Sequence, residues 1–127
     1  LQVAGAMAIA AANKASWTEL FNDFKTEYEV FSNSNYSIPS TSNPRLAGGM
    51  QWTAADYMDF LNKLATGKIL SEETLTQLRS NNMGSVTIVL SPATQIKQSW
   101  RYGYGVWLEN CHTSATCVSK RISSIGA

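Results

Sequence analysis

The residues best suited to metal or redox chemistry lie together near the end of the chain. Cys111, His112 and Cys117 are the only cysteines and the only histidine. A structural zinc site normally needs four such ligands, and two of these three are neighbours that cannot easily converge on one ion, so no metal site is expected. A disulfide between Cys111 and Cys117 would close a short loop, stabilise the fold by about 2 to 3 kcal/mol and require an oxidising compartment. Two reduced thiols in a cytosolic protein fit the same pair, and both alternatives stay open.

Acid–base chemistry has two further sets of candidates. His112 lies in the middle of an expected turn, a poor place to hold a general base rigidly, so an ordinary surface role is favoured. Asp56 and Asp59 are three residues apart on an expected helix. Asp56 is suited to a capping role and Asp59 to pairing with Lys63 four residues on. Both aspartates are therefore expected on a solvated face and not in a site of paired carboxylates.

An aromatic segment follows the helical part of the chain. Residues Trp100 to Glu109 alternate in the way typical of a β-strand. Tyr102, Tyr104 and Trp107 would suit a ligand groove, although burial in a core is the commoner role of aromatic residues on an alternating strand. We expect this strand to form an antiparallel hairpin with a second strand, from Val118 to Ala127, with the two cysteines at its tip.

Composition places these candidates in one folded unit. The 127 residues are 44% hydrophobic and 15% charged, which indicates a packed core and excludes a disordered tail or a coiled coil. The basic residues are spread along the chain, and only Lys120 and Arg121 are adjacent, so no nucleic-acid partner is expected. The apolar stretch from Leu1 to Ala12 is shorter than the roughly 20 residues that cross a bilayer, and no basic segment precedes it as in a signal peptide.

The first half of the chain is expected to contain two helices and a loop. Residues 1–12 carry no charge and have helical spacing, which predicts a helix buried on most sides. This helix opens without an N-cap, which indicates a piece of a longer protein. Ser16 and Glu19 form a capping box that predicts a second helix to about Lys25. Residues 32–44, rich in Ser, Asn, Thr and Pro, predict an irregular surface segment.

Two more helices and a change of period are expected in the second half. Thr53 is positioned to cap a helix over residues 54–66, which Gly67 would end. Ser71 begins a further helix that ends near Asn81. The β-branched run at residues 86–90 is typical of a strand. Helices followed by strands predict an α+β fold, with helices packed on an antiparallel sheet and a hairpin at the C-terminal end.

Several segments together resemble the later part of the beta-lactamase-related serine hydrolases, the superfamily of class C beta-lactamases, D-alanyl-D-alanine carboxypeptidases and carboxylesterases. In chain order these segments are LQVAGAMA, ASWTELF, SNPRLAGGMQWTAADYMDFLNKLATGKILSEETL, YGYGVWLE and SSIGA. The most specific element is the run Asn43, Pro44, Arg45, Ala47, Gly48, Gly49, followed by Thr53, Asp56 and Phe60. The resemblance implies that residues 1–127 are a single partial domain of the beta-lactamase/transpeptidase-like fold.

The resemblance also implies which chemistry is missing. The family uses a nucleophilic Ser in an SxxK motif and a Tyr in a second motif, and both would precede Leu1. None of the serines in this chain has Lys three residues on, so the chain as given cannot form an acyl-enzyme by this mechanism. The parent protein would hydrolyse a small-molecule ester or amide without a cofactor.

The third family motif has a candidate at the end of the chain. Ser124, Ile125 and Gly126 match its SxG form, and Ala127 maps onto the residue whose backbone N–H contributes to the oxyanion hole. Such a donor contributes about 2.7 to 4 kcal/mol to the stabilisation of a transition state. The alternative is an ordinary strand end with small residues. Beta-lactamases usually carry Lys or His in place of Ser124 to meet the substrate carboxylate, so an ester or simple amide substrate is favoured.

Three further questions remain open in the sequence. The rival hypothesis is a self-contained, non-catalytic binding domain that uses the strand from Tyr102 to Trp107 as its ligand face. The cysteine pair favours a periplasmic or secreted protein, with a cytoplasmic location as the alternative. The oligomeric state is not indicated by the sequence.

Overall fold

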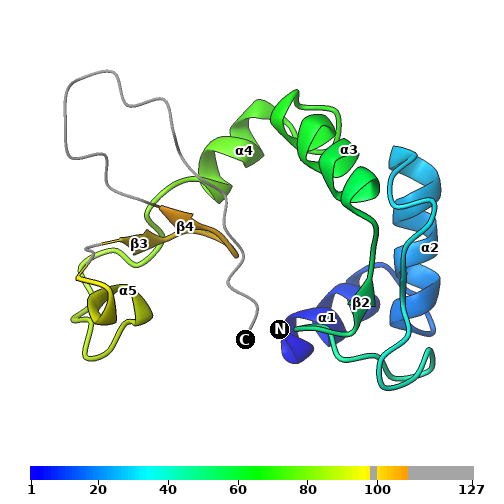
Figure 1. Cartoon of the computed structure of the whole chain (residues 1–127), viewed down its shortest axis with the longest axis horizontal. Coiled ribbons are helices and arrows are strands. Elements are labelled where there is room, and N and C mark those ends of the chain that lie inside the picture. The colour runs from blue at the N-terminus through cyan, green and yellow to red at the C-terminus, as the bar shows by residue number, and fades with distance from the viewer. Residues whose placement is uncertain (98–99, 109–127) are drawn as a thin grey trace. The chain divides into compact units, whose positions relative to one another are not determined.

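The computed structural model describes residues 1–97 and 100–108, and the chain divides into two compact units (Figure 1). The first unit holds residues 1–69, and the second holds the described residues from Leu70 onward. Within the described residues the secondary structure consists of helices and two small antiparallel sheets, which is α+β in general character. None of the helices in this part of the chain is long and apolar enough to cross a membrane.

The first helix, α1, runs from Gln2 to Ala11, and its exposure differs from the expectation of burial on most sides. Only Gly5 is buried, while Val3 and Met7 are 75% and 68% exposed. The helix approaches its own unit closely at Gly5, where a Cβ would overlap the side chain of Leu46. The small residues of α1 thus allow a close approach on one side, and nothing in the described chain covers the other.

The second helix, α2, runs from Trp17 to Tyr28, three residues beyond the expected end. The predicted cap is confirmed, because the Ser16 side chain accepts a hydrogen bond from the backbone N–H of Glu19 at 3.2 Å. The Glu19 carboxylate in turn accepts from the N–H of Ala15 at 2.9 Å, one residue before the position in a standard capping box. Glu29 ends the helix in the left-handed conformation, with φ of 52°.

The segment that was expected to be irregular contains a short strand. Strand β1 (Asn35–Tyr36) pairs antiparallel with β2 (Met50–Gln51), so that Asn35 faces Gln51 and Tyr36 faces Met50. Helix α3 (Ala54–Ala65) follows directly, capped by Thr53 as predicted, and Gly67 follows it with φ of 72°.

An aromatic core holds these elements of the first unit together. Phe21, Val30 and Phe31 are buried at its centre. Partly buried side chains from α2, the β1–β2 sheet, α3 and residue 69 surround them: Trp17, Phe24, Tyr28, Tyr36, Met50, Tyr57, Phe60 and Ile69. The core therefore connects the 30–36 segment to both α2 and α3.

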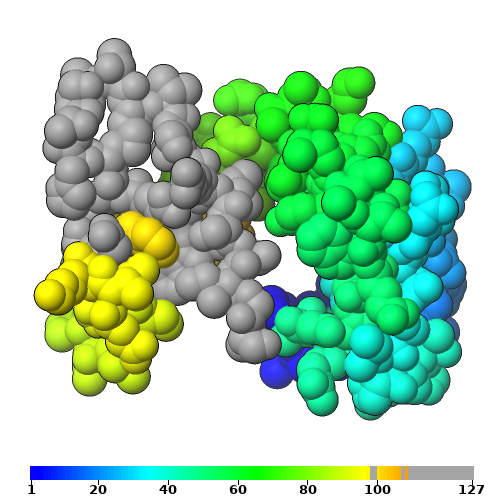
Figure 2. All heavy atoms as spheres, in the orientation of Figure 1, coloured from blue at the N-terminus to red at the C-terminus, as the bar shows by residue number. Residues whose placement is uncertain are grey.

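The second unit begins with helix α4 (Glu72–Leu78), capped by Ser71 as predicted. Leu75 is its buried residue, and helix α5 (Pro92–Gln95) buries Ala93. The β-branched run at residues 86–90 is not a strand: Val89 is 94% exposed, and this segment leads into α5, drawn in yellow in Figure 2. A run of β-branched residues makes a strand only where it finds a partner strand and a surface to cover.

The segment from Trp100 to Glu109 was expected to be one strand, and its described part is instead a tight hairpin of its own. Strand β3 (Arg101–Tyr102) pairs antiparallel with β4 (Trp107–Leu108). The chain reverses through Gly103, whose N–H donates to the carbonyl of Val106 at 2.8 Å. The single-strand prediction was wrong because the chain turns at Tyr104 and Gly105, where Gly105 has a φ of 73° in the left-handed region that favours glycine.

Candidate functional site

The residues that the sequence predicted for catalysis and cross-linking lie outside the described part of the chain. This applies to Ser124, Gly126 and Ala127 of the third motif, and to Cys111 and Cys117 of the predicted disulfide. It also applies to His112 and to the second strand of the hairpin that was expected from Val118 to Ala127. These assignments stay predictions.

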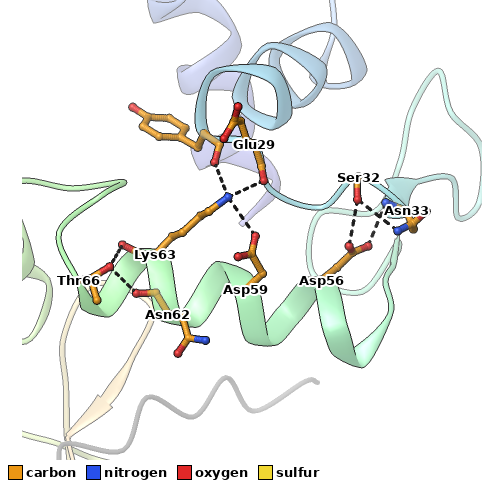
Figure 3. Close-up of polar contacts among 9 residues, drawn as sticks. Glu29, Ser32, Asn33, Asp56, Asp59, Asn62, Lys63 and Thr66 are labelled. Atoms are coloured by element: carbon orange, nitrogen blue, oxygen red, sulfur yellow. Dashed lines mark hydrogen bonds and ion pairs between the residues drawn. The ribbon is translucent and has the colours of Figure 1, made fainter.

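The densest polar cluster of the described chain joins α3 to the segment before β1 (Figure 3). Asp56, in the first turn of α3, accepts hydrogen bonds from the Ser34 hydroxyl at 2.6 Å, the Asn33 backbone N–H at 3.1 Å and the Ser32 hydroxyl at 3.4 Å. Its own N–H donates to the Thr53 side chain at 3.1 Å. The capping prediction for this turn is confirmed, but the expectation of a solvated carboxylate was wrong, because Asp56 is 7% exposed.

These contacts shift the titration of the carboxyl group. The short hydrogen bond from Ser34 lowers the pKa of Asp56 below its ordinary value of 3.8, burial opposes the shift, and the donors on Asn33 and Thr53 add to the lowering. Asp56 therefore stays ionised at neutral pH and acts as an acceptor.

A second cluster on α3 holds the C-terminal end of α2 (Figure 3). The Lys63 ammonium group donates to the backbone carbonyls of Tyr28 at 3.2 Å and Glu29 at 2.7 Å, and it pairs with Asp59 at 3.2 Å. The predicted pair of Asp59 and Lys63 is thus confirmed. A cation placed on the last carbonyls of a helix satisfies their free lone pairs and complements the negative end of the helix dipole.

A shallow pocket of about 400 Å³ lies beside α2 and the start of the 30–32 segment. It is lined by Asn22, Lys25, Thr26, Glu29, Val30 and Ser32. The Lys25 ammonium group is already engaged, since it donates to the Ser34 carbonyl at 2.8 Å and lies 5.8 Å from the centre of the Phe21 ring. Its contacts make Lys25 a link between α2 and β1.

These clusters do not form an acyl-transfer site. Among the described serines, Ser34 has the shortest hydrogen bond to a carboxylate, but the residue is 2% exposed and its hydroxyl already donates to Asp56, so no substrate can reach it. A carboxylate with a lowered pKa is also a weak general base. In the described ranges, no group of three or more His, Cys, Asp or Glu side chains is placed to hold a metal ion.

The sequence run from Asn43 to Gly49 forms a compact loop against α1. The side-chain amide of Gln2 donates to the Pro44 carbonyl at 3.1 Å and accepts from the Leu46 N–H at 3.0 Å. The loop closes on itself through the N–H of Gly49, which donates to the Arg45 carbonyl at 2.6 Å. The paired glycines therefore lie at the end of a tight, hydrogen-bonded turn.

The burial of Asp56 was missed by the sequence analysis. Its partners come from the Ser32–Asn35 run, more than twenty residues earlier in the chain. The sequence contained one signal for this contact. Residues 32–35 are a run of four small polar side chains, which supply hydrogen-bond donors for a carboxylate in the first turn of a helix.

Comparison of the chain with family models, curated proteins and solved structures finds no match.

Proposed function

We propose that this chain is the C-terminal part of a beta-lactamase-related serine hydrolase that acts on a small-molecule ester or amide through an acyl-enzyme. The strand Ser124–Gly126 would form a wall of the pocket, and the N–H of Ala127 would donate to the oxyanion. The nucleophile and its base belong to a part of the protein outside this sequence, so the chain alone is inactive. The protein needs no cofactor and works in the periplasm or outside the cell.

The observation that carries this proposal is the apolar outer face of α1. Val3 and Met7 lie one helical turn apart and are largely exposed, and α1 has no charged residue. Soluble proteins rarely leave such a face uncovered, and exposed apolar patches mark surfaces that pack against another body. In our proposal, the rest of the hydrolase domain packs against this face of α1.

The loop at Asn43–Gly49 gives a second line of support. It is the most specific part of the resemblance, and the second of its two glycines occupies a position where the packing requires glycine. A Cβ at Gly49 would overlap the carbonyl oxygens of Ile38 and Arg45, so only glycine fits without movement. The loop geometry thus requires glycine at a position where the family-like run supplies one.

The chemistry of the described residues agrees with the proposal that this chain is inactive by itself. Every serine within the described ranges lacks the Lys three residues on that the family mechanism needs. Ser34, which has the strongest acceptor beside it, is closed to substrate. The nucleophile and its base would therefore have to come from residues outside this chain.

Hydrolysis assays test the catalytic half of the proposal. The purified chain is incubated with a p-nitrophenyl ester and with nitrocefin, with and without a fluorophosphonate that labels active serines. We expect no turnover above buffer and no labelling. Turnover that the fluorophosphonate abolishes would overturn the assignment of the nucleophile to another part of the protein.

Sizing chromatography tests the structural half. The wild-type chain should self-associate through α1, and Val3→Gln/Met7→Gln should shift it to a monomer. Val89→Gln is the matched control, because it makes an even more exposed apolar residue of the other unit polar and should leave the association unchanged. A wild-type monomer with one cooperative unfolding transition would instead favour the self-contained binding domain.

The structure bears on that rival hypothesis at one point. It uses one continuous strand from Tyr102 to Trp107 as its ligand face, whereas the structure has two strands, β3 and β4, with Tyr104, 64% exposed, in the turn between them. The ligand face of that hypothesis would therefore have to be a hairpin and not a single strand.

A further inference from the structure

One sequence motif remains unexplained by either proposal. Asn35, Tyr36 and Ser37 match Asn-x-Ser, in which x is not Pro, and this is the acceptor pattern for N-linked glycans. It is the single match to this pattern in the sequence. The pattern alone is short, so its placement in the fold decides whether a glycan can be carried there.

The β1 strand turns Asn35 away from the core. Its two neighbours face inward: Ser34 is buried, and the ring of Tyr36 packs edge-on against those of Trp17 at 5.4 Å and Phe21 at 5.0 Å. Side chains alternate along a strand, so Asn35 lies on the opposite face, where it is exposed. This face can carry a bulky group without disturbing the aromatic core.

The third residue of the motif lies on the same outer face. The Ser37 hydroxyl donates to the side-chain oxygen of Gln51 at 2.7 Å, and Gln51 is the residue opposite Asn35 in the strand pair. Gln51 is exposed as well. The Asn35 amide makes no hydrogen bond within the part of the chain that the structure describes, so its nitrogen is available for substitution.

From this placement we infer that Asn35 is an N-glycosylation site. The donor is an oligosaccharide linked to a lipid diphosphate, and a membrane-bound oligosaccharide transferase catalyses the step. The Nδ2 atom of Asn35 forms a bond to C1 of the first sugar, the bond from C1 to the diphosphate oxygen breaks, and the lipid diphosphate leaves. Nδ2 gives up one proton, so atoms and charge balance without an oxidant or reductant.

The glycan would shield the outer face of the β1–β2 sheet. The inference requires export, as the predicted disulfide does, but it is independent of the hydrolase proposal. An inactive or an active chain would be glycosylated alike.

The test is translation of the full chain behind a secretory leader in the presence of microsomes. Wild type should give a slower band that is protected from external protease and that peptide N-glycosidase converts to the unmodified size. Asn35→Gln and Ser37→Ala should each abolish the slower band. Ser37→Thr, which keeps the motif, should retain it.

Asn43→Gln is the matched control, since Asn43 is also exposed but is followed by Pro44 and lies in no acceptor pattern. This variant should keep the slower band. A wild-type chain that is protected from protease but gives no slower band would overturn the inference. Such a chain would have entered the microsomes, where the transferase acts, without being modified. A slower band that persists in both Asn35→Gln and Ser37→Ala would overturn it equally.

Discussion

The hydroxyl of Ser34 donates to the carboxylate of Asp56 across 2.6 Å in the interior of the first unit. The two residues are 22 positions apart, and both are almost fully buried. A buried carboxylate is tolerated only when hydrogen bonds replace its lost hydration, and Asp56 has three donors from the 32–34 segment. This contact fixes the start of α3 to the entry of β1.

The stability of the first unit should fall in acid because of Asp56. Its pKa is lowered in the folded state, so the unfolded chain takes up the proton first as the pH drops. The stabilisation is therefore fully present above the ordinary value of 3.8 and is lost as the pH falls through the lower folded pKa. Thermal unfolding by circular dichroism, measured from neutral pH to well below 3.8 in the Val3→Gln/Met7→Gln background, follows this loss.

Asp56→Asn in the same background isolates this contribution. The variant should be less stable than its parent at neutral pH and should lose less of its remaining stability in acid. Asp59→Asn, which changes an exposed carboxylate on the same helix, should have a much smaller effect at neutral pH. Equal losses for the two variants would argue against the role that we assign to the Ser34 contact.

Lys63 should stabilise α2 through its C-terminal carbonyls. Lys63→Met keeps most of the apolar stem but removes the donor to Tyr28 and Glu29, and we expect a loss of about 1 kcal/mol. Hydrogen exchange should show the loss locally, as faster exchange in the last turn of α2. Because Asp59→Asn removes only the ion pair, it should leave that turn protected, and faster exchange there would show that the pair matters more than the carbonyl contacts.

Local features were predictable from the sequence, and distant contacts were not. Ser16, Thr53 and Ser71 each cap a helix as predicted, because a cap depends on residues only three positions away. The burial of Asp56 depends on a segment more than twenty residues distant, which no helical pattern reveals. The β3–β4 hairpin differs, because its turn depends on the local residue Gly105, a signal that the alternating pattern around it concealed.

The candidate site was predictable only in part, for a related reason. The third motif was identified by resemblance, and its residues lie outside the described chain. The exposure of α1 contradicts a prediction made from its apolar composition, because composition does not say whether a cover is present. Apolar residues at helical spacing identify a helix face that can be buried. Whether that face is buried depends on which other parts of the protein pack against it.

Leu75 should be the main apolar anchor of the second unit. It is 1% exposed, and truncating a fully buried leucine to alanine typically costs about 2 to 5 kcal/mol through lost transfer energy and the cavity left behind. Leu75→Ala should abolish protection from hydrogen exchange in α4 and in the β3–β4 hairpin. Val86→Ala, which truncates an exposed apolar residue of the same unit, should change protection little, and a similar loss in both variants would show that Leu75 is not the anchor.

The two neighbouring glycines of the Asn43–Gly49 loop should respond in opposite ways to alanine. A Cβ at Gly49 would overlap backbone carbonyls that cannot move aside as side chains can, so Gly49→Ala should cost about 1 to 3 kcal/mol of stability. A Cβ at Gly48 would meet nothing within 4 Å, and Gly48→Ala should be neutral or slightly stabilising. Denaturant unfolding of both variants in the Val3→Gln/Met7→Gln background measures the difference. Equal stability of the two would mean that the loop does not pack against Ile38 and Arg45 as the structure has it, and would remove one support of the hydrolase proposal.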